Sequence, residues 1–117
     1  MLLVEDDPIQ LRTREAILRG AGLEVCIATS ARSALALVRA EAHDFGAIIT
    51  DHLMPDLSGA EFVRQLRAMN HGIPVIVLSG LPDAQQEYEG LDATFRQKPC
   101  PPAELIRLVR RFVDKAA

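Results

Sequence analysis

Short apolar runs alternate with longer amphipathic stretches along this chain. The apolar runs, each of which predicts a strand, are Leu2–Val4, Val25–Ala28, Ala47–Thr50, Val75–Leu78 and Thr94–Arg96. The third and fourth runs are unbroken and rich in Ile and Val, which is typical of strands covered on both faces. Strands that alternate with helices predict an α/β fold with one open parallel sheet, connected by right-handed crossovers.

Two of the amphipathic stretches show a clear helical pattern. Between Ala60 and Met69, and again between Ala103 and Val113, apolar residues recur every three or four positions and charged residues face away from them. Residues that favour helix ends stand between the elements, namely Pro8, Gly20, Gly22, Ser30, Ser58 and Pro101-Pro102. Because no linker or repeat interrupts this pattern, we interpret residues 1–117 as one domain.

The composition, with 49% hydrophobic and 25% charged residues, is ordinary for a globular protein. A net charge of −3 offers no general attraction for nucleic acid, so we expect no direct nucleic-acid binding. No stretch approaches the ~20 apolar residues of a membrane helix, and we expect no membrane insertion. Cys26 and Cys100 have no C-x-x-C spacing, which predicts ordinary thiols in a reducing cytoplasm.

Residues suited to chemistry follow four of the five predicted strands. They are Glu5, Asp6 and Asp7 after the first strand, Asp51 after the third, Ser79 after the fourth and Lys98 after the fifth. Ligands of open parallel sheets bind outside the carboxyl ends of the strands, so we expect these side chains to cluster. Each one alone has an ordinary explanation, such as an acid that complements a helix dipole. Their convergence on one edge of a sheet has no such ordinary explanation.

A cluster of carboxylates is expected to bind a cation, and the cation together with Lys98 and Ser79 is expected to bind an anion. Two carboxylates ~5 Å apart repel each other by roughly 3 kcal/mol at an effective dielectric constant of 20. Oxygen ligands without a His or Cys cluster favour Mg²⁺ or a similar hard ion such as Mn²⁺. A metal ion, an ammonium group and a hydroxyl group together suit a phosphoryl group, whose outer oxygens need neutralising partners.

Four motifs stand in order along nearly the whole chain. They are Leu3-Val4-Glu5-Asp6-Asp7, Asp51-x-Leu53-Met54-Pro55 with Gly59, Val77-Leu78-Ser79-Gly80 and Phe95-x-x-Lys98-Pro99. Through them the chain resembles the response-regulator receiver domains of two-component signalling. The resemblance implies a flavodoxin-like fold with strand order 2-1-3-4-5, helices on both faces and a cis Lys98–Pro99 bond.

The resemblance implies a phosphoryl acceptor with a metal site. Asp51 would take the phosphoryl group from a phosphohistidine on a histidine kinase or a histidine phosphotransfer protein. Mg²⁺ would be held by Glu5, Asp6, Asp51 and the backbone carbonyl of Leu53. Asp7 lies outside the acidic pair of the family, and we interpret it as a helix-start residue.

The resemblance also implies how the phosphoryl group becomes a signal. Lys98 would pair with Asp51 and then with the phosphoryl oxygens, and Ser79 would donate its hydroxyl group to them. Phe95 matches the aromatic switch position. The face of the fourth helix, fifth strand and fifth helix would contact a downstream effector of unknown identity, or a second copy of the chain in a homodimer. The domain would not be an enzyme in the usual sense, since it would promote only its own phosphorylation and dephosphorylation.

Two departures from the family pattern predict specific differences. The interval between the fourth and fifth strands is short, so we expect a short or irregular helix around Asp83–Glu89. Hydrophobic Leu53 and Leu81 stand two residues past Asp51 and Ser79, respectively. Neither side chain can position a hydrolytic water molecule, which predicts slow self-dephosphorylation.

Other functions fit the residues less well. A phosphoaspartyl phosphatase is expected to carry a second Asp where this chain has Leu53, and the acids after the first strand would repel the phosphate of a flavin. The remaining alternative is a receiver-like interaction module that acts without phosphorylation. His43, His52 and His71 are not expected to take a direct part in chemistry.

Overall fold

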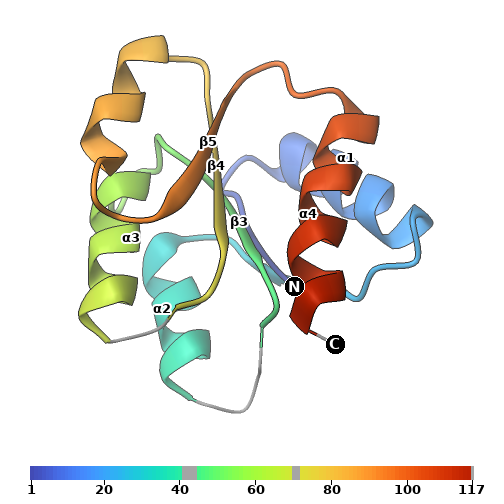
Figure 1. Ribbon diagram of the computed structural model, residues 1–117, viewed down its shortest axis with the longest axis horizontal. Coiled ribbons are helices and arrows are strands. Elements are labelled where there is room, and N and C mark those ends of the chain that lie inside the picture. Colours follow the sequence, from blue (N-terminus) through green and yellow to red (C-terminus); the bar gives the residue numbers. More distant parts are fainter. Residues whose placement is uncertain (41–44, 70–71, 117) are drawn as a thin grey trace.

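Five parallel strands form one sheet in the order β2-β1-β3-β4-β5, as shown by a computed structural model that describes residues 1–40, 45–69 and 72–116 (Figure 1). The strands are β1 Leu2–Val4, β2 Cys26–Ala28, β3 Ile48–Asp51, β4 Val75–Ser79 and β5 Ala93–Gln97. The implied strand order and flavodoxin-like fold are confirmed. Each predicted strand is present, with its ends shifted by at most one residue.

The helices also match the predicted pattern. They are α1 Pro8–Gly20, α2 Ala31–Arg39, α3 Gly59–Ala68 and α4 Pro102–Ala116, with a 3₁₀ helix η1 at Pro82–Tyr88. The element η1 confirms the irregular helix expected between β4 and β5. The Lys98–Pro99 peptide bond is cis, as implied.

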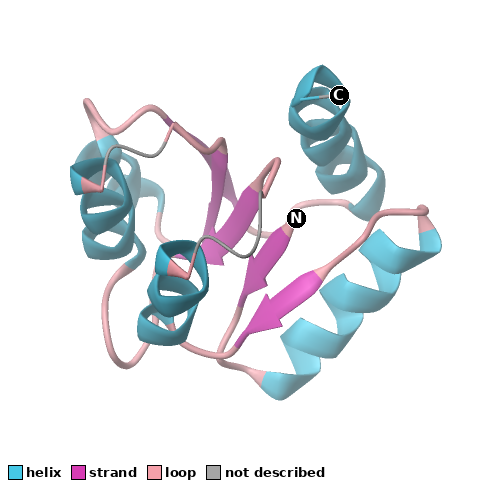
Figure 2. Ribbon diagram, turned by 90° about the horizontal axis from the view of Figure 1, so that it is seen from below, coloured by secondary structure: helices cyan, strands magenta, loops and turns pink. Residues whose placement is uncertain are grey.

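The sheet is buried on both faces, which explains its continuous apolar strands. Leu2 and Val4 of β1 pack with α2 and α3, whereas Leu3 between them packs with α1 and α4. The same alternation places Ile48 and Ile49 of β3 on opposite faces. Figures 1 and 2 show the two helix pairs on either side of the sheet. Because helices cover both faces of the sheet, a ligand can reach the strands at their carboxyl ends.

Helix starts fix the loops at this edge. The Asp7 carboxylate accepts hydrogen bonds from the amides of Ile9 and Gln10, which confirms Asp7 as a helix-start residue. In the loop after β3, Asp56 accepts from the amides of Ala31 and Arg32 at the start of α2. Burial raises the pKa of Asp56, but these amide donors outweigh it and hold the pKa below its ordinary value. The loop that follows Asp51 is therefore tied to a neighbouring helix.

Candidate functional site

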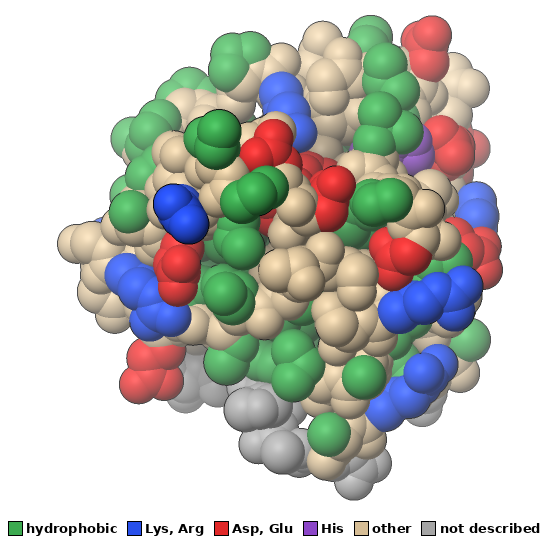
Figure 3. Space-filling model, turned by 180° about the vertical axis from the view of Figure 1, so that it is seen from behind, with side chains coloured by type: hydrophobic (Ala, Val, Ile, Leu, Met, Phe, Trp, Pro, Cys, Tyr) green, Lys and Arg blue, Asp and Glu red, His purple; other side chains and the backbone are tan. Residues whose placement is uncertain are grey.

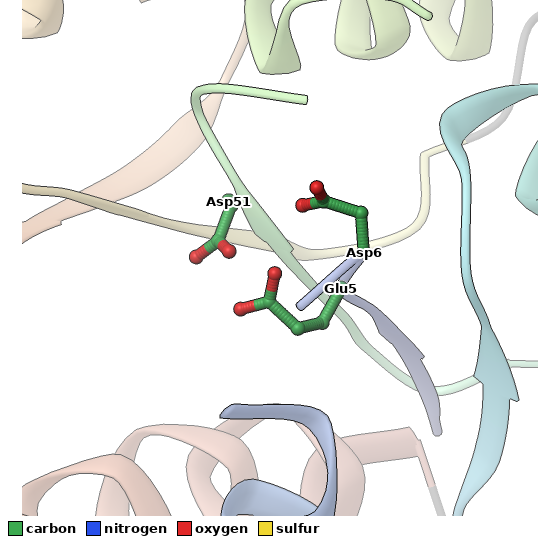
Figure 4. Close-up of side chains that lie close together, drawn as sticks. All are labelled: Glu5, Asp6 and Asp51. Atoms are coloured by element: carbon green, nitrogen blue, oxygen red, sulfur yellow. The ribbon is translucent and has the colours of Figure 1, made fainter. Parts of the chain in front are cut away.

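Three carboxylates meet at the carboxyl edge of the sheet. Glu5 and Asp6 follow β1, Asp51 ends β3, and one oxygen of each lies within 4.8 Å of the others (Figure 4). Glu5 and Asp51 are buried, whereas Asp6 is exposed. The convergence expected from the strand ends is thus present, because β1 and β3 are neighbours in the sheet.

Two cations face these acids. The Lys98 Nζ lies 3.1 Å from Asp51 Oδ1. The Arg14 Nη1 lies 2.7 Å from Glu5 Oε1 and 3.0 Å from the same Asp51 oxygen. Gln10 joins the two cations, since its Oε1 accepts hydrogen bonds from Arg14 Nη2 at 3.0 Å and from Lys98 Nζ at 3.1 Å. Asp51 therefore lies between both positive groups.

The local electrostatics suit a hard divalent cation. Burial, with the neighbouring Asp51 carboxylate as a further cause, raises the pKa of Glu5 well above its ordinary value, and Arg14 only partly opposes this. Burial is the larger cause, and the part of the rise that comes from Asp51 reflects two negative groups placed side by side. Three convergent carboxylates form an oxygen-only donor set, which is what Mg²⁺ prefers, so the residues present fit this ion.

Ser79 and Lys98 come together at the ends of β4 and β5. The Lys98 amide donates to the Ser79 carbonyl at 2.7 Å. The buried Ser79 hydroxyl accepts from the Leu81 amide at 2.9 Å and donates to the Leu81 carbonyl at 3.4 Å. The hydroxyl group is thus engaged by its own loop.

Arg14 and Gln10 belong to the site, but the sequence analysis did not select either of them. A signal for Arg14 does exist, because it stands three residues after Leu11 and four before Leu18, the two buried apolar residues of α1. A charged residue on the buried stripe of a helix needs a partner. Gln10 offers no comparable signal.

A second set of polar side chains begins at His52, the residue that follows Asp51. The His52 Nδ1 is 2.7 Å from the Tyr88 hydroxyl, and Nε2 is 3.1 Å from a Glu87 carboxylate oxygen. Because a carboxylate only accepts, Nε2 carries a proton in this arrangement, and in that tautomer of the neutral ring Nδ1 accepts from the Tyr88 hydroxyl. Burial raises the pKa of Tyr88, so it stays protonated, and its ring lies 5.9 Å from that of Phe95. The residue after Asp51 is therefore linked to the implied switch position.

The histidines and Cys100 were also considered in the sequence, and their roles stay predictions. His52 lies outside the acidic cluster, and His43 and His71 lie outside the described residues. Burial raises the pKa of the Cys100 thiol, so this group stays protonated. No helix in the described part of the chain is long and apolar enough to cross a membrane.

A groove opens beside the acidic cluster. It has a volume of about 460 Å³ between α1, the Lys98–Cys100 segment and α4, and both Arg14 and Lys98 line it. Exposed hydrophobic residues stand next to the site residues in sequence, namely Ile9, Leu53 and Leu81. Figure 3 shows one face of the molecule on which acidic side chains gather among hydrophobic ones.

Known proteins resemble this chain in both sequence and structure. A family model described as the response regulator receiver domain matches residues 1–110. The C4-dicarboxylate transport transcriptional regulatory protein DctD of Pseudomonas aeruginosa is 34% identical over 97% of this chain and 25% of its own length. The transcriptional regulatory protein PrrA of Mycobacterium tuberculosis is 38% identical over 98% of this chain and 50% of its own length. The chain thus spans half or less of these relatives.

A solved structure shows the same agreement. The chemotaxis protein CheY4 of Vibrio cholerae has a TM-score of 0.82 and 32% sequence identity to this chain, and the match covers 95% of each.

Proposed function

The chain belongs to the response regulator receiver domain family, and we propose that it accepts a phosphoryl group on Asp51 with Mg²⁺ bound beside it. One observation carries this proposal. The buried Asp51 carboxylate lies 3.1 Å from Lys98 and within the group of three carboxylates that could hold a metal ion. A nucleophile, a cation and a metal-binding group are thus assembled around one side chain.

The chemistry follows from this arrangement. An Asp51 oxygen attacks the phosphorus of a phosphohistidine, the new O–P bond forms as the P–N bond breaks, and the bonding electron pair stays on the imidazole of the donor. Lys98 neutralises charge on the transferring oxygens. Glu5, Asp6, Asp51 and the Leu53 carbonyl would hold Mg²⁺, which supplies further neutralisation of those oxygens. The domain acts only on itself, so it is not an enzyme with a separate substrate.

The donor is a histidine kinase or a histidine phosphotransfer protein in the cytoplasm. Exposed Ile9, Leu53 and Leu81 stand two or three residues after Asp6, Asp51 and Ser79, respectively, and we propose that they form an apolar surface around the charged centre. Such a surface suits a protein that must bring a phosphohistidine to Asp51 and then leave.

The signal leaves through η1, β5 and α4. On phosphorylation the Ser79 hydroxyl exchanges its Leu81 partners for a phosphoryl oxygen, which moves the start of η1. Tyr88 of η1 contacts both His52 and Phe95, so that movement changes the surroundings of Phe95. A downstream effector, or a second copy of the chain, binds this face in one of the two states.

The test is the intact mass of the protein after incubation with Mg²⁺ and acetyl phosphate. We expect a gain of one phosphoryl group that is lost in alkali, and no gain with EDTA or in Asp51→Asn. No gain in the folded native protein, either with acetyl phosphate or with a phosphohistidine donor, would favour a module that binds its partner without phosphorylation.

Self-dephosphorylation is expected to be slow, with a half-life of minutes or longer in Mg²⁺ buffer. The Leu53 side chain is exposed and apolar, so it cannot orient a water molecule toward the phosphoryl group. Leu53→Asn should shorten the half-life severalfold, because its amide can hold such a water. Ile27→Asn, an equally polar change at an exposed residue of β2, should leave the half-life unchanged. A half-life of seconds in the native protein would contradict this prediction.

A further inference from the structure

Arg14 places a guanidinium group among the carboxylates that would bind a metal ion. Its Nη1 lies 2.7 Å from Glu5 Oε1 and 3.0 Å from Asp51 Oδ1, and only 11% of its side chain is exposed. Both of these acids belong to the group of three that could hold an ion. The guanidinium group therefore occupies two of the carboxylates that a divalent cation needs.

The position of Arg14 on α1 makes this contact costly to give up. Leu11 and Leu18 on the same stripe of the helix are buried, so Arg14 emerges from an apolar surface. A partly buried charge is tolerated only when it is paired. Glu5, Asp51 and the Gln10 side chain provide that pairing.

The charge balance of the site points the same way. Arg14 and Lys98 already neutralise part of the charge of Glu5, Asp6 and Asp51. A divalent cation at these oxygens would lie a few ångströms from Arg14, and like charges at that distance repel by kilocalories per mole at protein dielectric constants. Either the guanidinium group moves away or the ion binds weakly.

The structure provides a place for Arg14 to move to. The groove of about 460 Å³ beside the site is lined by Arg14 itself, by Thr13 on the same helix and by Leu105 of α4. An arginine side chain has several rotatable bonds, so this groove is the space into which the guanidinium group would turn on leaving Glu5 and Asp51.

We propose that Arg14 is a built-in competitor of Mg²⁺, which occupies Glu5 and Asp51 in the metal-free domain and turns into the groove when the ion binds. This inference rests on the proposed function, since it assigns a regulatory residue to the same site. Its consequence is a domain that loads Mg²⁺ only at higher concentrations than the three carboxylates alone would require, so that its readiness for phosphorylation depends on the free Mg²⁺ concentration.

The experiment is a calorimetric titration of MgCl₂ into the native protein, Arg14→Met, Arg14→Gln and Arg12→Gln. Met suits the apolar stripe between Leu11 and Leu18, and Gln is a second neutral replacement in case one variant fails to fold. Arg12 is exposed on the same helix, so its replacement removes the same charge from the molecule outside the site. Circular dichroism verifies that each variant is folded.

We expect both Arg14 variants to bind Mg²⁺ at least about tenfold more tightly than the native protein, which corresponds to about 1.4 kcal/mol. Arg12→Gln should stay within twofold of the native value. Equal or weaker binding by folded Arg14 variants would overturn the inference, and so would an equal gain in Arg12→Gln.

Failure of this inference can be told apart from failure of the proposed function, because Mg²⁺ binding is measured without phosphoryl transfer. Tighter binding by the Arg14 variants supports the competitor role even if acetyl phosphate adds no mass to the native protein. Unchanged binding in a native protein that is still phosphorylated on Asp51 overturns the competitor role alone. An absence of Mg²⁺ binding in every folded variant overturns both.

Discussion

Gly59→Ala is expected to destabilise the fold by about 2–4 kcal/mol, at the upper end of what overpacking costs. A Cβ at this position would lie 2.6 Å from the Asp51 carbonyl oxygen and 3.0 Å from the His52 Cα, and it would collide with the Tyr88 hydroxyl. Two of these neighbours are backbone atoms, which cannot turn aside. The Gly59 amide also donates to the His52 carbonyl at 2.6 Å, so the two segments cannot separate without losing a hydrogen bond.

Denaturant unfolding of Gly59→Ala and Gly20→Ala tests this expectation. Gly20 also lies in a helix, but no described atom comes within 4 Å of the place that a Cβ would take there. Gly20→Ala should therefore be neutral or stabilise by up to about 1 kcal/mol through helix propensity. Equal unfolding free energies for the two variants would show that the contacts around Gly59 do not constrain the fold.

Much of the fold could be predicted because the composition of each strand reflects whether its two faces are buried. Runs such as Val75–Leu78 are apolar at every position, which only a sheet covered on both faces requires. Helix ends could be located for a similar reason, since Ser58 and Asp7 satisfy amides that lie next to them in sequence. A structural feature that depends on neighbouring residues can therefore be recognised from a short stretch of sequence.

The candidate site was partly predictable through a rule of topology. Glu5, Asp51 and Lys98 are far apart in sequence, but each lies at the last residue of a strand or directly after it, and parallel strands bring their carboxyl ends to one edge. The roles proposed for these residues stay predictions until phosphorylation and metal binding are measured.

Contacts made by helix faces and loops could not be predicted in the same way. The pairing of His52 with Tyr88 joins residues that are 36 positions apart and depends on how η1 lies against β5. The contact of Arg14 with Asp51 spans 37 positions and depends on the rotation of α1 about its axis. If η1 or α1 were shifted by one position, its contact would be lost. The hydrophobic pattern of the sequence would remain almost the same.

Lys98→Gln is expected to slow phosphorylation of Asp51 by about a hundredfold or more, because loss of one preorganised donor to developing charge typically costs 10²–10³ in rate. The Lys98 Nζ lies 3.1 Å from Asp51 Oδ1 on the side open to a donor, with 30% of its side chain exposed. The fold should survive, since Asp51 keeps its ion pair with Arg14. The measurement is the initial rate of phosphoryl gain from acetyl phosphate at saturating Mg²⁺.

Arg96→Gln is the matched control for Lys98→Gln. Arg96 lies on β5 and pairs with Glu104 of α4 at 3.3 Å, away from the acidic cluster, so its loss should change the rate less than threefold. The two cations at Asp51 are then distinguished by the signs of their effects. Loss of Lys98 removes a group that the transferring oxygens need, whereas loss of Arg14 frees the oxygens that Mg²⁺ needs. A Lys98→Gln rate within fivefold of the native rate would mean that Arg14 can replace Lys98, and that the two cations share one task.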